Sequence, residues 1–152
     1  MKKIKIGDVF EISTPKGYAY LHYIKKDKTI GELVRVLPGL YSEEPTDIKK
    51  TVGSDELFYI FFPLSFAYKK GIVRLVNNCE ASNYDVPKYM RTEHNVRGEF
   101  LGWHIVNTQT WERTLVKTLN AEQIKFSPWG VWNDTLLIER LTNNWSLEEW
   151  SN

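Results

Sequence analysis

KIKIGDVFEISTPKGYAYLHYI (residues 3–24) is the stretch that decides the fold. Its first half places apolar side chains on alternate positions, interrupted by polar Asp8, which is the period of a strand with one buried face. Pro15 and Gly17 then predict a turn, because proline presets φ and glycine accepts a positive φ. Residues 18–25 favour a second strand and residues 29–37 a third, so the sequence predicts an antiparallel meander.

The middle of the chain predicts more strands around one short helix. Residues 56–62 are apolar on both faces, as in a buried central strand, and Pro63 ends that run. Residues 64–71 predict a short helix closed by a glycine, and residues 72–78 predict another strand. Residues 80–99 are polar and mixed in character, so we expect them to form mostly loop.

The last third of the chain predicts a hairpin followed by a helix. Residues 100–107 and 110–119 favour two paired strands. Residues 133–144 predict a C-terminal helix, because Asn133 or Asp134 can cap its first turn and three leucines supply a buried stripe. The pattern of residues 146–149 matches a capping box and indicates one last short turn.

These elements predict a single β-rich domain over residues 1–152. Its class is α+β, with mainly antiparallel sheet that is partly barrel-like, a short central helix and a C-terminal helix. Hydrophobic residues make up 42% of the chain and aromatic residues 14%, which is enough for a substantial core.

Charge and cysteine content narrow the function classes. The net charge is +1, although residues 1–30 are basic while residues 32–56 and 133–152 are acidic. One cysteine, Cys79, fits a reducing compartment, and no apolar run has the length of a signal-peptide core or a membrane span. These features predict a cytoplasmic protein with no membrane partner.

Catalytic and metal-binding motifs are not apparent in the sequence. His22, His94 and His104 are far apart, and no pattern of metal-ligand spacing connects them. Cys79 could act as a nucleophile with His94 or His104 as its base, but a lone cysteine is more often a small buried residue. We therefore expect no metal, no cofactor and no catalytic residues, and hence a protein that is not an enzyme.

Aromatic residues leave two interpretations open. Three tyrosines at positions 18, 20 and 23 lie near lysines 16, 25, 26 and 28, a combination that can stack bases and hold phosphates. The near-neutral net charge argues against nucleic-acid binding. Four of the six tryptophans fall in the last 24 residues, where they either attach the C-terminal helix to the sheet or form a partner-binding patch.

The opening stretch resembles the N-terminal signature of the immunity protein 26 family of bacterial polymorphic toxin systems. The matching residues are Gly7 to Phe10, Ile12, and Gly17 to Tyr20. The segments FFPLSFAYKKGIVRLVNN, VPKYM, GWHIVN and LLIERL are similar to later parts of the family in the same order. The resemblance implies a non-catalytic protein that binds and neutralises a cognate toxin domain, often a nuclease, and it implies no catalytic residues.

We expect the partner to dock on an acidic surface. Glu43, Glu44 and Asp47 would steer a basic nuclease domain toward the protein. Trp150, two residues from the end of the sequence, is the tryptophan that we expect to be exposed and to bind the partner. The alternative hypothesis is a β-barrel-like domain that binds nucleic acid or a small ligand.

Overall fold

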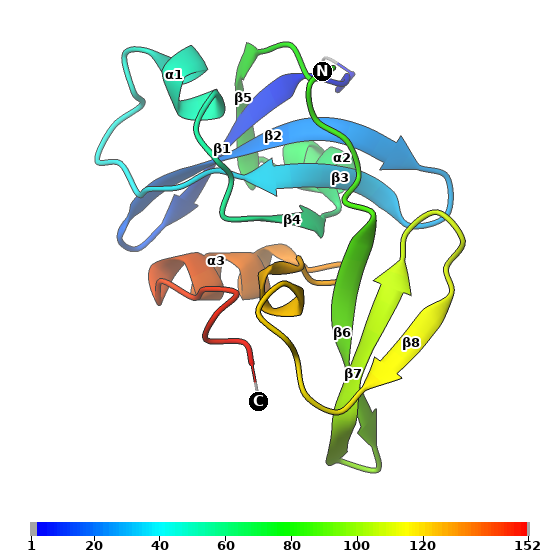
Figure 1. Cartoon of the computed structure of the whole chain (residues 1–152). Helices are drawn as coiled ribbons and strands as arrows, with labels where there is room; N and C mark the ends of the chain where they lie inside the picture. Colours follow the sequence, from blue (N-terminus) through cyan, green and yellow to red (C-terminus); the bar gives the residue numbers. More distant parts are fainter. Residues whose placement is uncertain (1–2, 152) are drawn as a thin grey trace.

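Residues 3–151, the part of the chain that the computed structural model describes, fold into two antiparallel sheets and three α-helices (Figure 1). The first sheet has the strand order β4-β3-β2-β1-β5, and the second has the order β6-β7-β8. The predicted α+β class is confirmed. The first sheet does not close into a barrel, because within these residues its end strands, β4 and β5, do not pair with each other.

The element bounds follow the predictions closely in the first half of the chain. The first sheet contains β1 (Asp8–Thr14), β2 (Gly17–Asp27), β3 (Gly31–Val36), β4 (Phe58–Phe61) and β5 (Val73–Asn78). The second sheet contains β6 (Tyr89–Val96), β7 (Glu99–Asn107) and β8 (Arg113–Val116). The helices are α1 (Ile48–Val52), α2 (Leu64–Lys69), α3 (Asp134–Thr142) and a 3-10 turn (Gln123–Lys125).

The β1–β2 hairpin forms as the sequence predicts, and its turn depends on a glycine. Gly17 has a φ of +133°, and a Cβ at this position would lie 2.8 Å from the carbonyl oxygen of Tyr41. Next to it, Tyr18 and Tyr41 exchange two backbone hydrogen bonds of 2.8 and 2.9 Å. The close approach allowed by Gly17 therefore attaches the long β3–β4 connection to the first hairpin.

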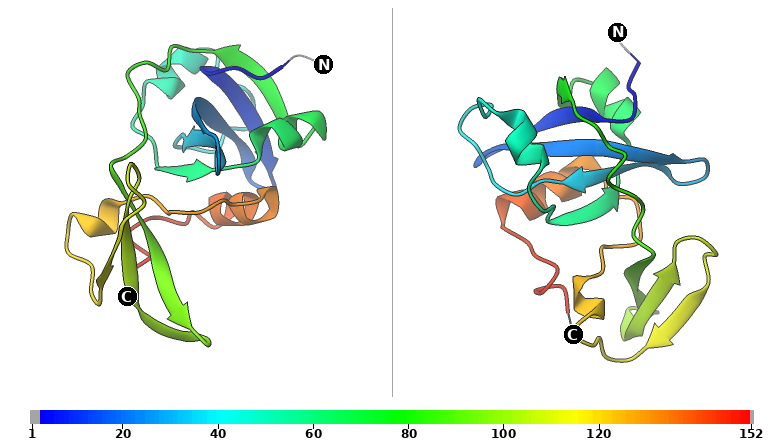
Figure 2. Two further views of the ribbon diagram at one scale, coloured as in Figure 1. Left: turned by 90° about the vertical axis from the view of Figure 1, so that its right-hand side faces the viewer. Right: turned by 45° about the horizontal axis from the view of Figure 1, so that its top comes forward.

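Helix α3 closes the concave side of the first sheet. Figures 1 and 2 show this sheet curved over α3, with the second sheet projecting beyond the helix. Leu137 and Leu141 of α3 are buried against Phe10, Ile12 and other apolar residues of the first sheet. The helix begins where predicted, because the Asn133 side chain accepts a hydrogen bond of 2.8 Å from the backbone N–H of Leu136.

Strand β6 corrects the expectation that residues 80–99 are mostly loop. Its sequence, YMRTEHNV, lacks an apolar alternation, yet all eight residues pair with β7. The strand buries Met90 and Arg91, and Arg91 is a residue that sequence patterns assign to the surface. Because a buried position of β6 holds a charged residue, the strand lacks the alternation of apolar and polar residues by which strands are usually recognised.

Arg91 holds three segments together inside the protein. Its side chain is fully buried between the rings of Trp103 and Trp150, with 4.7 and 4.3 Å from the guanidinium carbon to the ring centres. The guanidinium donates hydrogen bonds to four backbone carbonyls, those of Ile124, Phe126, Leu147 and Trp150. Burial lowers the pKa of Arg91 to about 10. Backbone carbonyls thus take the place that a carboxylate usually has around a buried arginine.

Arg35 forms a second buried centre under the β3–β4 connection. Its guanidinium bonds Glu56 at 2.7 Å and the carbonyls of Val52 and Ser54 at 2.9 and 2.8 Å. The ring of Tyr84 lies 3.7 Å from the guanidinium carbon. Because Val52 ends α1 and Ser54 and Glu56 follow it, Arg35 fixes the end of the β3–β4 connection onto the sheet.

Replacing Arg91 should destabilise the fold far more than replacing an exposed arginine. Arg91→Met removes the donor from four carbonyls, of which that of Leu147 is in a buried bond and the others are in partly buried bonds, so we expect the free energy of unfolding to fall by about 3–5 kcal/mol. Arg97→Met is the control, since Arg97 is exposed at the β6–β7 turn and forms no ion pair with a carboxylate among residues 3–151, so its replacement should cost less than about 1 kcal/mol. Urea denaturation measures both, and equal losses would contradict the structural role of Arg91.

His22 should make the protein less stable in mild acid. Its ring is fully buried; Nδ1 accepts from Arg35 at 3.1 Å, so Nε2–H donates to the carbonyl of Cys79 at 3.0 Å. Burial, followed by the charge of Arg35, lowers the pKa of His22 below its ordinary value, although the Cys79 contact acts in the opposite direction. Below that ordinary value only the unfolded chain takes up the proton, so stability should fall as the pH drops.

Two measurements check this pH dependence. From about pH 6.5 downward, the contribution of His22 to the free energy of unfolding should fall by up to about 1.4 kcal/mol per pH unit. An NMR titration should show the His22 ring still neutral at a pH where an unfolded-chain histidine is protonated. A His22 ring that titrates at the ordinary value in the folded protein would contradict the prediction.

Candidate functional site: a groove between the two sheets

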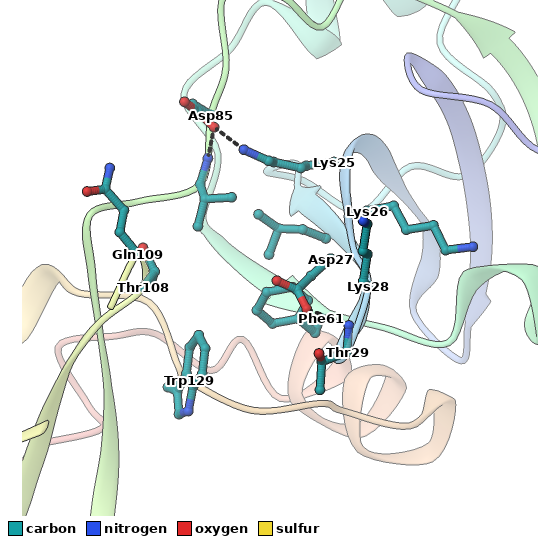
Figure 3. A pocket seen from close by; sticks show the side chains of 12 residues that line it. Lys25, Lys26, Asp27, Lys28, Thr29, Phe61, Asp85, Thr108, Gln109 and Trp129 are labelled. Atoms are coloured by element: carbon teal, nitrogen blue, oxygen red, sulfur yellow. Dashed lines mark hydrogen bonds and ion pairs between the residues drawn. The ribbon is translucent and has the colours of Figure 1, made fainter. Parts of the chain in front are cut away.

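A groove separates the β2–β3 turn from the β7–β8 turn. Its larger hollow has a volume of about 500 Å³ and is shown in Figure 3. Lys25, Asp27 and Thr29 come from the end of β2 and its turn, while Thr108 and Gln109 come from the opposite turn. Segments that are distant in sequence therefore supply the two walls, and the groove exists only because the two sheets lie side by side.

The floor of this larger hollow is apolar. Leu33 and Phe61 are buried core residues, and Trp129 packs against Phe61 at 5.9 Å between ring centres, with the rings perpendicular. Trp129 and Thr29 also line a smaller neighbouring hollow of about 280 Å³. That hollow is lined further by Ile30, Val106, Trp111, Arg113 and Gly130. Both hollows are lined by Trp129, so they adjoin there. The smaller hollow is the more apolar compartment of the groove, and the larger hollow has charged residues at its rim.

The rim of the larger hollow carries more positive than negative charge. Lys25 forms an ion pair of 3.2 Å with Asp85, and Figure 3 shows this pair across the mouth. The backbone N–H of Val86, followed by Lys25, lowers the pKa of Asp85. Asp27 accepts hydrogen bonds from the backbone N–H groups of Thr29 and Ile30 at 2.8 and 2.9 Å. Both carboxylates thus have internal donors.

Lys28 is the rim lysine that remains available for a ligand. Lys26 and Lys28 are exposed, and among residues 3–151 neither ammonium group forms an ion pair with a carboxylate. Figure 3 shows the Lys26 side chain directed away from the larger hollow, and Lys26 also lines a separate hollow with Tyr23 and Tyr68. Lys25 and Lys28 supply the positive charge at the mouth. The rim can therefore attract an anion without first breaking an internal contact at each lysine.

Trp111 is exposed and lies in a strained backbone conformation. Its φ is +66°, in the left-handed region that large side chains avoid, and 46% of its surface is exposed. Its N–H donates to the carbonyl of Asn107 at 2.7 Å, so the turn imposes this conformation. The ring contacts Trp129 at 6.0 Å between ring centres. A strained, exposed aromatic residue at the edge of a hollow indicates a functional role.

The residues that the sequence assigns to partner binding lie elsewhere. Glu43, Glu44 and Asp47 are exposed on the β3–β4 connection, at the opposite end of the first sheet from the groove (Figures 1 and 2). Glu44 bonds Arg74 at 3.0 Å, and Asp47 caps α1 by accepting from Lys50 N–H at 3.3 Å. The structure brings these three carboxylates together on one loop.

Trp150 lies apart from the acidic residues and packs against the core. Its ring contacts Trp103 and Trp145 at 4.9 and 5.8 Å between ring centres, and it covers Arg91. Its indole N–H donates to Glu93 at 3.3 Å. These contacts give Trp150 a structural function, and the residue is half-buried rather than exposed.

The candidates for catalysis and metal binding are separated. His94 and His104 stack at 4.4 Å between ring centres on the second sheet, whereas Cys79 follows β5 beside His22. Burial raises the pKa of Cys79, which lowers the fraction of reactive thiolate. Within the described residues, no group of three or more histidine, cysteine or acidic side chains has a geometry that could hold a metal ion.

Most of the groove could not be identified from the sequence. The sequence shows the lysines of the β2–β3 turn and the high tryptophan content. No sequence motif marks Phe61, Gln109, Trp111 or Trp129 as lining a binding site. The β7–β8 turn is positioned by the pairing of β7 with β6, and the sequence predicted the residues of β6 to be mostly loop. The one available signal was Trp111 directly after the polar residues of a hairpin turn, a position where glycine or asparagine is usual.

Comparisons with known proteins give no relative. A scan against models of protein families, a search of curated proteins and a search of solved structures each found no match to this chain. None of the helices in residues 3–151 combines the length and apolar character that crossing a bilayer requires.

Replacing Trp111 with asparagine should leave stability nearly unchanged. Asn tolerates the left-handed conformation, so the substitution recovers about 1 kcal/mol of strain while it loses a similar amount of packing at a half-exposed ring. Trp129→Ala removes a ring that packs on Phe61, and it should cost about 3 kcal/mol. Thermal and urea denaturation compare the variants, and a large loss for Trp111→Asn would show that the ring is retained for packing.

Proposed function

We propose that this chain is a non-catalytic immunity protein that binds and neutralises a cognate toxin domain. The proposal rests on the resemblance of the opening hairpin to the immunity protein 26 family and on one structural observation. The β3–β4 connection presents Glu43, Glu44 and Asp47 to solvent while both of its ends are fixed. A rigid acidic loop suits a basic partner, because little conformational entropy is lost when it docks.

The loop is fixed by three independent sets of contacts. The backbone of Tyr41 pairs with Tyr18 at its start, and Arg35 bonds Glu56 and the carbonyls after α1 at its end. In between, Arg74 bonds Glu44 and Glu11, both at 3.0 Å. Arg74 neutralises part of the charge of Glu44, so Glu43 and Asp47 are the carboxylates that a partner would meet.

Nuclease toxins supply the basic surface that this loop would recognise. A protein that binds nucleic acid carries lysines and arginines for phosphate contacts, and an acidic inhibitor can compete for the same surface. Electrostatic attraction of this kind raises the association rate and decreases with salt. The partner is expected to be the C-terminal domain encoded by the adjacent upstream gene, as the resemblance implies.

Neutralising the loop should slow association with the toxin domain. We expect the double variant Glu43→Gln/Asp47→Asn to reduce the association rate constant about tenfold at low salt, with a smaller reduction at high salt. Asparagine keeps the cap of α1, so the fold should be preserved. Stopped-flow measurements over a salt series, with co-expression to test loss of toxicity, check this prediction.

Glu99→Lys is the matched control, because Glu99 is an exposed acidic residue at the start of β7 in the second sheet, and its replacement changes the net charge by the same two units. It should leave the association rate nearly unchanged. Equal slowing by both variants would mean that only the net charge matters, and unchanged salt dependence in the double variant would reject the acidic loop as the docking surface. Failure of the wild-type protein to bind and neutralise the domain would contradict the proposed function itself.

A further inference from the structure

We infer that the groove between the two sheets binds a nucleoside phosphate. The smaller hollow would hold the base, and the larger hollow would hold the sugar and the phosphate. Because the groove lies at the opposite end of the first sheet from the acidic loop, this inference does not depend on the proposed function. The ligand chemistry follows from an aromatic compartment that adjoins a cationic one.

The smaller hollow suits a flat aromatic ring. Trp111 and Trp129 line it with their indoles at an angle of 71°, so a ring stacked on one can meet the edge of the other. Ile30 and Val106 provide apolar contacts, and the guanidinium of Arg113 offers donors to acceptor atoms on a base. The left-handed backbone conformation of Trp111 places its exposed ring at this hollow, where the ring could stack on a base.

The larger hollow suits an anionic group attached to that ring. Lys28 is free of carboxylate partners within the described residues, and Lys25 shares its charge with Asp85. The hydroxyls of Thr29 and Thr108 and the amide of Gln109 can bond a sugar. A free mononucleotide and the end of a single strand present the same chemical unit, and the near-neutral net charge does not oppose binding of one such unit.

An acidic peptide is the main competing ligand, and the aromatic compartment argues against it. Lysines alone would attract any anion, but an exposed tryptophan in a strained conformation adds a requirement for a flat ring. A nucleoside phosphate satisfies both requirements with one molecule. A peptide of aspartates and glutamates satisfies only the first.

Titration of the full-length protein with adenosine 5′-monophosphate tests the inference. Binding should be saturable by calorimetry and should quench tryptophan fluorescence, because two of the lining residues are tryptophans. Ribose 5-phosphate and adenosine, which each lack one half of the recognised unit, should bind at least about tenfold more weakly. A six-nucleotide single strand distinguishes the sources: tighter binding than the mononucleotide indicates a strand end, and equal binding indicates a free nucleotide.

Three variants locate the site. Trp111→Asn should weaken binding about tenfold or more through the loss of stacking, and Lys25→Gln/Lys28→Gln should weaken it by a similar factor and reduce its salt dependence. Asp85→Asn keeps the hydrogen bond to Val86 N–H but releases Lys25, so binding should become a few-fold tighter. Lys16→Gln, at the β1–β2 turn, is the control and should change nothing.

Several results would overturn the inference. Absence of saturable binding by both the mononucleotide and the single strand would exclude a nucleoside phosphate. Equal binding of ribose 5-phosphate or of an acidic hexapeptide would show that the groove recognises charge alone. Binding that Trp111→Asn and the double lysine variant leave unchanged, in proteins that keep their wild-type melting temperature, would place the ligand outside the groove.

Discussion

The buried guanidinium of Arg91 is the constraint on which the arrangement of the two sheets depends. A charged group inside a protein must have hydrogen-bond acceptors, and Arg91 obtains them from four carbonyls in two segments that follow β8. Its backbone also bonds Ser127 and Trp129, at 2.9 and 2.7 Å. The same segment then reaches β4, where Ser127 Oγ accepts from Tyr59 N–H at 2.9 Å. One residue of β6 thus sets where the second sheet lies against the first.

The groove is a consequence of that connection. Trp129 follows directly from the segment that bonds Arg91, and its ring separates the two hollows. The β7–β8 turn, which carries Trp111, is placed by the pairing of β7 with β6. Arg35 has the corresponding function at the other end of the first sheet, where it fixes the connection that carries the acidic residues. Two buried arginines therefore position two oppositely charged surfaces.

The first sheet could be predicted from the sequence because each of its strands has a recognisable pattern within its own residues. Alternation in residues 3–13, a Pro–Gly turn and the apolar run before Pro63 each predict an element without reference to the rest of the chain. The second sheet could be predicted only in part. The exposed residues of β6 are mostly polar and one of its two buried residues is an arginine, so the strand lacks an apolar alternation. The groove could not be predicted, because residues 25–29, 61, 108–113 and 129 come together only through long-range pairing.

Trp111 links fold and function most directly. Its turn could be built with asparagine or glycine at the same φ without strain, so stability alone does not account for a tryptophan there. Packing does not account for it either, since nearly half of the residue's surface is exposed and its contact with Trp129 is edge-on. A residue that is unfavourable for the backbone and only partly used by the core is retained for what it contacts outside the chain. Trp111 opens onto the smaller hollow, and that hollow adjoins the lysine-lined larger hollow at Trp129, so the ligand that we infer for this position is both flat and anionic.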